Sequence, residues 1–147
     1  TLLRRWNVVD EDRVRSLLRN VTQNLRYLAD EVSAPENRRS EPIWIAGVKY
    51  WLVTAIESCV DVAQHIAGSE KWRTPSDNGD AMRVLGENGV LETELAERMR
   101  MAVAFRNVVV HEYTRVDDRI VLERLADPSD LEMFVHAVNS WLESVAD

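Results

Sequence analysis

Apolar residues recur at spacings of three and four over most of the chain, which is the pattern of amphipathic helices. The first such stretch runs from Asp10 to Val32, and its acidic start suits the unpaired amides of a helix N-terminus. A longer apolar stretch opens at Glu41 and Pro42 and is expected to end at Gly68. These two stretches predict the two longest helices of the protein.

The middle of the chain predicts a shorter helix behind a polar connection. This connection contains Pro75 and Gly79, which favour a surface loop. A short helix is expected over 80–87, with Gly89 as its stop. The apolar spacing resumes at Glu92, where a fourth helix is expected to begin.

Three consecutive β-branched valines at 108–110 have weak helix propensity, so the pattern does not fix the residue at which this fourth helix ends. A short helical piece follows over 119–125, and after Pro128 a last amphipathic helix reaches Val145. The chain has no internal repeat and no strand-type alternation. It therefore predicts an all-α fold, an antiparallel bundle of four to five helices in one domain over 1–147.

Length and charge limit the function classes. A chain of 147 residues with 46% hydrophobic and 29% charged residues suits one globular domain. Its net charge of -7 argues against a protein that coats nucleic acid, because that mode needs clustered Lys and Arg. Any contact with nucleic acid is therefore expected to be local. The cations are nearly all arginine, which favours bidentate binding of phosphate or carboxylate.

Cysteine usage and hydropathy indicate the compartment. The single cysteine, Cys59, lies in an apolar stretch and predicts a buried thiol in a reducing environment. The chain has no uncharged apolar run of about 18 residues and no signal-peptide pattern at its start. We therefore expect a cytoplasmic protein that makes no contact with a membrane.

The richest chemistry lies in the segment R-N-V-V-V-H-E-Y, from Arg106 to Tyr113. Cleavage of RNA by its own 2'-hydroxyl needs a base, an acid and a cation near phosphorus. The imidazole of His111 suits proton transfer, and the Arg106 guanidinium suits the phosphoryl oxygens. The phenol of Tyr113 is a group that can be modified.

The R-x4-H-x-Y arrangement of Arg106, His111 and Tyr113 resembles the HEPN-domain HepT-like toxins. The similarity continues through V-L-E-T-E-L-A-E-R-M-R-M-A-V-A-F-R-N-V-V-V-H-E-Y-T-R-V-D at 90–117, and A-I-E-S-C-V-D-V-A-Q-H-I at 55–66 resembles the second helix of the family. The resemblance implies an all-α homodimer that is a metal-independent endoribonuclease, needs no cofactor and has tRNA as its target class. It also implies a type VII toxin–antitoxin pair, in which an MntA-type nucleotidyltransferase antitoxin adenylylates Tyr113.

Helix geometry complicates a site made by one chain. Five residues on an ideal helix turn two side chains about 140° apart, so Arg106 and His111 do not share a face. Either the helix ends or distorts across 108–110, or the site combines residues of two subunits about a two-fold axis. We favour the second explanation with some contribution from the first. A symmetric interface would also bring two copies of His111 together.

Four more polar residues are candidates for supporting roles. Asn107 lies four residues before His111 and is placed to orient the imidazole or to contact a phosphate. Glu57, Asp61 and His65 follow one another at spacings of four, and such a line either binds metal, frames the RNA site or is a solvated polar stripe. The family places an acidic residue on this helix near its cleft, which favours Asp61.

Other interpretations of the motif remain open. In the first, Arg106 pairs with Glu112 or with an acid on another helix, His111 is a satisfied interfacial residue and Tyr113 packs. In the second, the chain is a noncatalytic HEPN module that docks a nucleotidyltransferase and supports nucleotide or substrate binding. In the third, it is a helical dimerisation protein. Mutation of Arg106 and His111 distinguishes these from a ribonuclease.

Overall fold

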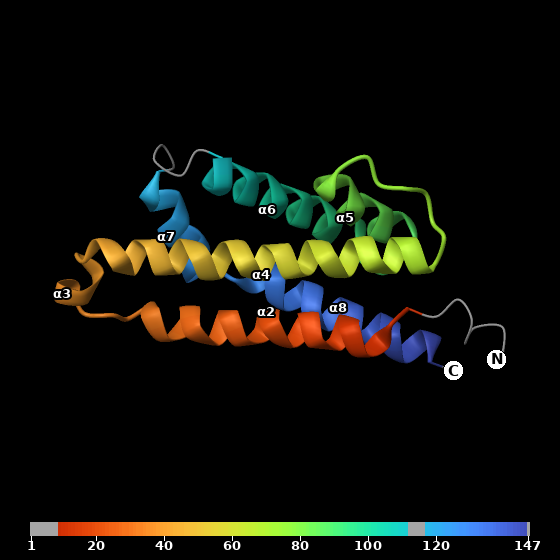
Figure 1. Ribbon diagram of the computed structural model, residues 1–147, viewed down its shortest axis with the longest axis horizontal. Coiled ribbons are helices and arrows are strands. Elements are labelled where there is room, and N and C mark those ends of the chain that lie inside the picture. The colour runs from red at the N-terminus through yellow and green to blue at the C-terminus, as the bar shows by residue number, and fades with distance from the viewer. Residues whose placement is uncertain (1–8, 112–116, 147) are drawn as a thin grey trace.

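The computed structural model describes residues 9–111 and 117–146, and within these ranges all regular structure is helical (Figure 1). The helices are α2 (Glu11–Glu31), α3 (Glu36–Arg39), α4 (Pro42–Ser69), α5 (Asn78–Glu87), α6 (Thr93–His111), α7 (Asp118–Ala126) and α8 (Ser129–Val145). The predicted all-α fold is therefore confirmed.

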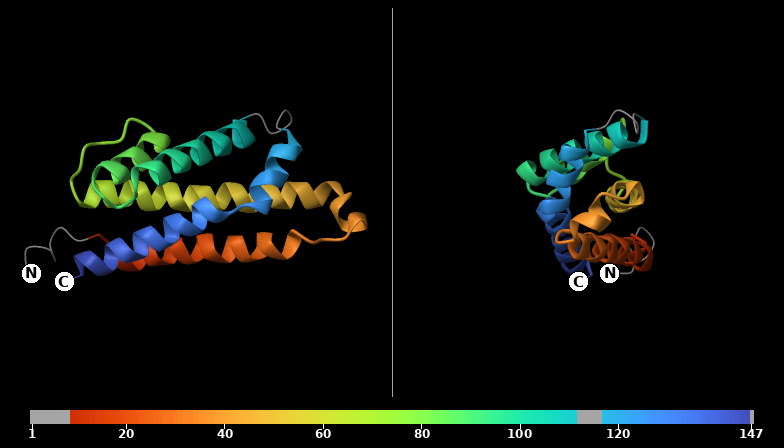
Figure 2. Two further views of the ribbon diagram at one scale, coloured as in Figure 1. Left: turned by 180° about the vertical axis from the view of Figure 1, so that it is seen from behind. Right: turned by 90° about the vertical axis from the view of Figure 1, so that its left-hand side faces the viewer.

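The long helix α4 is the centre of the bundle. Helices α5 and α6 lie along one side of it and α2 along the other, while α8 packs against both α2 and α6 (Figures 1 and 2). Helix α7 crosses α4 near the end where α3 joins it to α2. Consecutive long helices run antiparallel, as the short connections predict.

Most helix boundaries lie within two residues of the predicted ones, because the capping residues are visible in the sequence. The carboxylate of Asp10 accepts from the amide of Arg13 at 3.0 Å, and Asp77 caps α5 in the same way. The exception is α3, which was not predicted. Its four residues begin behind Pro35 and are too few for a hydrophobic period to show.

The apolar residues of α4 are buried on several sides because all six of the other described helices contact it. Cys59 is fully buried as predicted, and burial raises the pKa of its thiol far above the ordinary range. By length and composition alone, α4 is also long and apolar enough to cross a membrane. Half of its most apolar window is buried in the bundle, and the core helix of a globular protein has the same composition.

Buried polar side chains join α2 to the start of α4. Glu31 is 6% exposed, accepts from Nε1 of Trp44 at 3.0 Å and pairs with Arg38. Asn24 donates to the hydroxyl of Thr54 at 2.7 Å. Because an unpaired buried polar group is costly, these bonds favour one register between the two helices.

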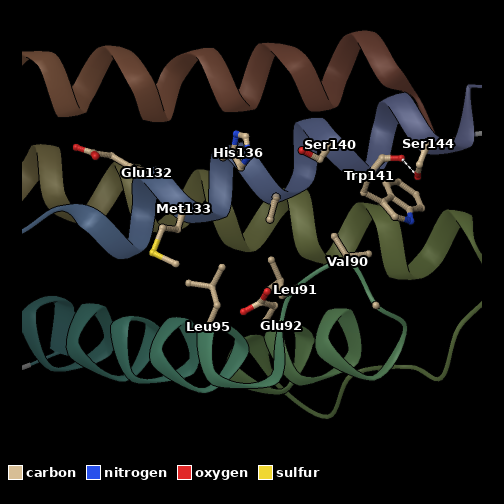
Figure 3. A pocket seen from close by; sticks show the side chains of 12 residues that line it. Val90, Leu91, Glu92, Leu95, Glu132, Met133, His136, Ser140, Trp141 and Ser144 are labelled. Atoms are coloured by element: carbon tan, nitrogen blue, oxygen red, sulfur yellow. Dashed lines mark hydrogen bonds between the residues drawn. The ribbon is translucent and has the colours of Figure 1, made fainter.

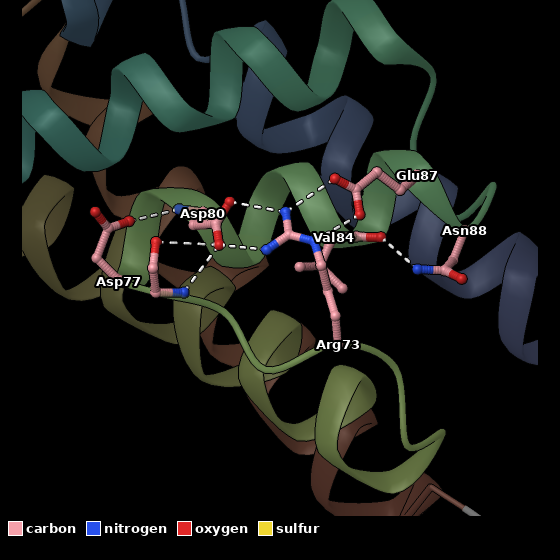
Figure 4. A network of polar contacts seen from close by, with 7 residues as sticks. Arg73, Asp77, Asp80, Val84, Glu87 and Asn88 are labelled. Atoms are coloured by element: carbon pink, nitrogen blue, oxygen red, sulfur yellow. Dashed lines mark hydrogen bonds and ion pairs between the residues drawn. The ribbon is translucent and has the colours of Figure 1, made fainter.

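An ion-pair network holds the connection between α4 and α5 (Figure 4). The guanidinium of Arg73 donates to both oxygens of Asp80, at 2.7 and 2.9 Å, and to Glu87 at 2.8 Å. Asp80 also accepts from the amide of Ser76 at 2.8 Å. Hydrogen bonds from Arg73 hold the pKa values of both carboxyls below their ordinary values. These bonds hold the loop between α4 and α5 against the first turn of α5, where Asp80 is buried.

Close packing of α5 on α6 depends on Gly86, and alanine at this position is expected to destabilise the protein. A Cβ atom there would lie 2.8 Å from the Cβ of Ala96, so the helices must move apart. We expect Gly86→Ala to lower the free energy of unfolding by about 1–3 kcal/mol in urea titrations. Gly47→Ala is the matched control, since nothing lies within 4 Å of its new Cβ. Because alanine favours helix, Gly47→Ala is expected to gain about 0.5–1 kcal/mol. Equal stabilities for the two variants would contradict this packing.

Candidate functional site

The motif lies at the C-terminal end of α6, which continues as an α-helix through the three valines to His111. Val109 is buried in the bundle, whereas Val108 and Val110 are 44% and 42% exposed. The predicted helix distortion across 108–110 is therefore wrong, because packing of Val109 outweighs the weak helix propensity of valine. On this regular helix Arg106 and His111 stay about 140° apart.

The side chain of Arg106 is held by the central helix. Its Nε and Nη2 atoms donate to Oε1 of Glu57 at 3.1 and 2.7 Å, and its Nη1 donates to Oδ1 of Asn107 at 3.0 Å. The Arg106 side chain is 22% exposed and that of Glu57 is 40% exposed. The alternative interpretation expected Arg106 to pair with an acid on another helix, and Glu57 of α4 is that acid. This pairing fits a structural role and a catalytic role equally.

The guanidinium keeps capacity for a further acceptor. Arginine has five N–H bonds, and the three hydrogen bonds to Glu57 and Asn107 occupy three of them. Among the described residues, no acceptor takes the remaining two. A fixed cation with two spare donors at a partly exposed position matches the fork geometry of a phosphate.

The structure brings together some of the predicted site residues. Asn107 bonds to Arg106, and no bond joins it to His111 within the described part of the chain. His111 is exposed as the last residue of α6. The predicted modification site, Tyr113, lies outside the described residues, as does Glu112.

The line of polar residues on α4 divides between two places. Glu57 contacts Arg106, whereas Asp61, one turn further, is exposed. His65 lies at the other end of the line, where its Nε2 accepts from the backbone N–H of Asp10 at 3.0 Å. In residues 9–111 and 117–146, no three His, Cys, Asp or Glu side chains gather where they would hold a metal ion. The described residues therefore give no support to a metal site on this line.

His65 should make the stability of the protein depend on pH. Its Nε2 accepts a hydrogen bond from the amide of Asp10, so this nitrogen is unprotonated. Burial and the nearby Arg13 lower the pKa of His65 below the ordinary 6.5, and the carboxylate of Asp10 opposes this with a smaller effect. The unfolded chain then binds the proton more readily, so this stabilisation is complete above about pH 6.5 and is lost as pH falls through the lower folded pKa. Urea titrations across this window should show a weaker pH dependence for His65→Gln. The exposed His136 provides the control, since His136→Gln should keep the wild-type slope; an unchanged slope for His65→Gln would refute the assignment.

A large cavity lies at the other end of α6 from the motif, beside Leu95 (Figure 3). It is an apolar groove of about 780 Å³ between α8 and the connection from α5 to α6, and it is lined by residues that include Val90, Leu95, Met133 and Trp141. A smaller cavity of about 280 Å³ adjoins the motif, with Asn107 in its wall. The reactive groups of the motif therefore lie at the exposed end of α6 and where α6 contacts α4, and not in the large groove.

Three relatives are similar to this chain in sequence. A protein of Archaeoglobus fulgidus is 31% identical over 124 residues, which cover 84% of this chain and 93% of that protein. The mRNA nuclease HepT of Shewanella oneidensis is 26% identical over 85 residues, covering 57% of this chain and 64% of that protein. The tRNA nuclease HepT of Aphanizomenon flos-aquae is 28% identical over 87 residues, with 58% and 59% covered.

Solved structures share the fold, and a family model matches most of the sequence. A tri-AMPylated HEPN toxin of Shewanella oneidensis in complex with MNT antitoxin superposes with a TM-score of 0.81 at 19% identity, covering 88% of this chain and 98% of that one. The cytosolic protein YutE of Bacillus subtilis, of unknown function, has a TM-score of 0.80 at 21% identity, covering 92% of both chains. At these identities the likeness concerns the fold. The family model described as "Ribonuclease HepT-like" matches residues 18–138. The chain therefore belongs to the HepT-like ribonuclease family.

Proposed function

We propose that this protein is the toxin of a HEPN/nucleotidyltransferase toxin–antitoxin pair and cleaves RNA without a metal ion. The single observation that carries the proposal is the Arg106 guanidinium, which Glu57 and Asn107 fix while no other described residue takes its two remaining N–H donors. It lies on the helix that ends with exposed His111. Relatives named as mRNA and tRNA nucleases support RNA as the substrate, and tRNA is the target class that we propose.

The proposed reaction is an attack by the ribose 2'-oxygen on the adjacent phosphorus. A base removes the 2'-hydroxyl proton, the P–O5' bond breaks, and an acid returns a proton to the leaving 5'-oxygen. The products are a 2',3'-cyclic phosphate and a 5'-hydroxyl. Arg106 stabilises the charge on the phosphoryl oxygens, and His111 transfers the protons.

We propose further that two subunits complete the site. A regular α6 directs Arg106 and His111 about 140° apart, so one helix does not aim both at one phosphate. Beside the motif, α6 also exposes the large apolar side chains Met101, Val108 and Val110, at 51%, 44% and 42%. Met101 and Val108, seven residues apart, share one face of α6, whereas Val110 lies nearly opposite. A two-fold contact along the Met101–Val108 face would bury these two side chains and bring His111 of one subunit beside Arg106 of the other, where one imidazole takes up the 2'-hydroxyl proton and returns a proton to the leaving oxygen.

The antitoxin is proposed to be an MntA-type nucleotidyltransferase that adenylylates Tyr113 in the cytoplasm. AMP at this position would place a bulky anion beside the motif, where it blocks RNA by charge and by volume. We expect Tyr113→Phe to escape neutralisation by nucleotide transfer, as measured by mass spectrometry and growth. Tyr50→Phe, which changes a 65% exposed tyrosine on α4, should be neutralised normally. Neutralisation of Tyr113→Phe by transfer would refute this switch.

The noncatalytic docking module is the second candidate, because the Arg106–Glu57 pair would hold the two helices together even without catalysis. Expression of the isolated chain separates the two functions. A ribonuclease arrests growth and cuts purified RNA in the presence of EDTA, and the Arg106→Ala/His111→Ala double variant does neither. Absence of RNA cleavage by the wild-type chain would favour the docking module.

A further inference from the structure

A second groove, between α2 and α8, is lined by three arginines and by no carboxylate. It has a volume of about 410 Å³, and α2 supplies Arg15, Arg19 and Arg26 to its wall. The other lining residues are polar or aliphatic, namely Leu18, Thr22, Gln23, Val135 and Asn139. In a chain with a net charge of -7, such a concentration of cations is unusual and needs an explanation.

The three arginines form a straight row on α2. Their spacings of four and seven residues place them within about 40° of one another around the helix and along about 16 Å of its axis. Arg15 is anchored, since its Nη1 donates to Oδ1 of Asn139 on α8 at 3.2 Å and its Nη2 pairs with Glu11 at 2.8 Å. Arg19 and Arg26 are exposed and make no hydrogen bond or ion pair with any described residue.

Most of the other described arginines pair with a carboxylate, whereas Arg19 and Arg26 do not and lie in one groove. A carboxylate lies within 4.0 Å of each of Arg38, Arg73, Arg83, Arg98, Arg100, Arg106 and Arg119. The groove instead combines uncompensated guanidiniums with the amides of Gln23 and Asn139 and the hydroxyl of Thr22. Among the described residues, Arg15 is the one arginine of this row that pairs with a carboxylate, that of Glu11, so Arg19 and Arg26 remain to attract a polyanion and to fit successive phosphates.

We infer that the α2–α8 groove is a second RNA-binding site, which holds the phosphate backbone of the substrate away from the cleavage site. Its use in substrate binding rests on the proposed ribonuclease function. The arginines lie on α2, which does not contact α6, whereas α8 packs against both helices, so an RNA that fills both sites must reach around α8 or α4 (Figures 1 and 2). The second site therefore selects extended or folded RNA over short oligonucleotides.

The test compares an Arg19→Ala/Arg26→Ala variant with an Arg13→Ala/Arg39→Ala control, which loses the same charge outside the groove. Binding of bulk tRNA is measured in a His111→Ala background, so that no cleavage interferes. The groove variant is expected to bind tRNA roughly tenfold more weakly at about 0.1 M salt, with a salt slope shallower by about 1–2. When His111 is retained, the groove variant should cleave a tetranucleotide at the wild-type rate. Its KM for tRNA should rise.

Unchanged tRNA affinity and salt slope in the groove variant would overturn the inference, and so would an equal loss in the control. A groove variant that binds tRNA normally but fails to retain an acidic protein partner would overturn it in favour of a protein-binding surface. Because the binding measurement needs no catalysis, its outcome is independent of the proposed function. If tRNA binding depends on the groove while the wild-type chain cuts no RNA, only the ribonuclease proposal fails.

Discussion

Arg106→Ala is expected to reduce the rate of RNA cleavage by about 10²–10³-fold, the usual effect of removing one donor group that stabilises transition-state charge. The guanidinium is positioned before RNA arrives, since Glu57 and Asn107 take three of its N–H bonds. In the proposed mechanism, its two remaining N–H bonds meet the charge that develops on the phosphoryl oxygens. Cleavage of a labelled RNA under single-turnover conditions measures this rate, and a rate near the wild-type value would contradict the role of Arg106.

Two conservative variants separate charge from geometry at this position. Arg106→Lys keeps the charge but not the planar fork, so most of the loss should remain. Glu57→Gln keeps an acceptor for Arg106 but removes the ion pair, and it should lower cleavage less than Arg106→Ala does. If Arg106→Lys were fully active, a general positive charge would explain the site and the contacts to Glu57 and Asn107 would be irrelevant to cleavage.

His111→Ala is expected to reduce cleavage by about 10²–10⁴-fold, the range for loss of a general acid–base group. The imidazole is exposed at the end of α6, so its removal should leave the core and the unfolding midpoint unchanged. The matched control is His136→Ala, because His136 is also exposed but lies on α8 in the wall of the remote apolar groove. His136→Ala should cleave at the wild-type rate. Equal rates for the two variants would remove His111 from the mechanism.

The fold was largely predictable from the sequence because its signals are local. The hydrophobic period and the acidic start at Asp10 reproduce the long helices to within two residues. The short helix α3 was missed, since it has no buried residue and hence no apolar period. The continuation of α6 through the valines depends on the burial of Val109 against other helices, which propensity does not reveal.

The candidate site was only partly predictable, because its contacts join residues far apart in the chain. Spacing identified Arg106 and His111, and it placed Glu57, Asp61 and His65 in one line. It did not reveal that Glu57, rather than the favoured Asp61, would bond to Arg106, since this depends on how α4 packs against α6. The bond of His65 to Asp10 likewise depends on the packing of α2.

In the proposed mechanism, Arg106 and His111 act in one RNA-cleaving site although a single helix directs them apart. The most direct measurement mixes equal amounts of Arg106→Ala and His111→Ala proteins, exchanges their subunits and assays RNA cleavage. In a shared site, half of the dimers are mixed and each has one intact site of two, so we predict recovery of about one quarter of the wild-type activity. No recovery, with mixed dimers formed and both parents inactive, would contradict a site shared between subunits.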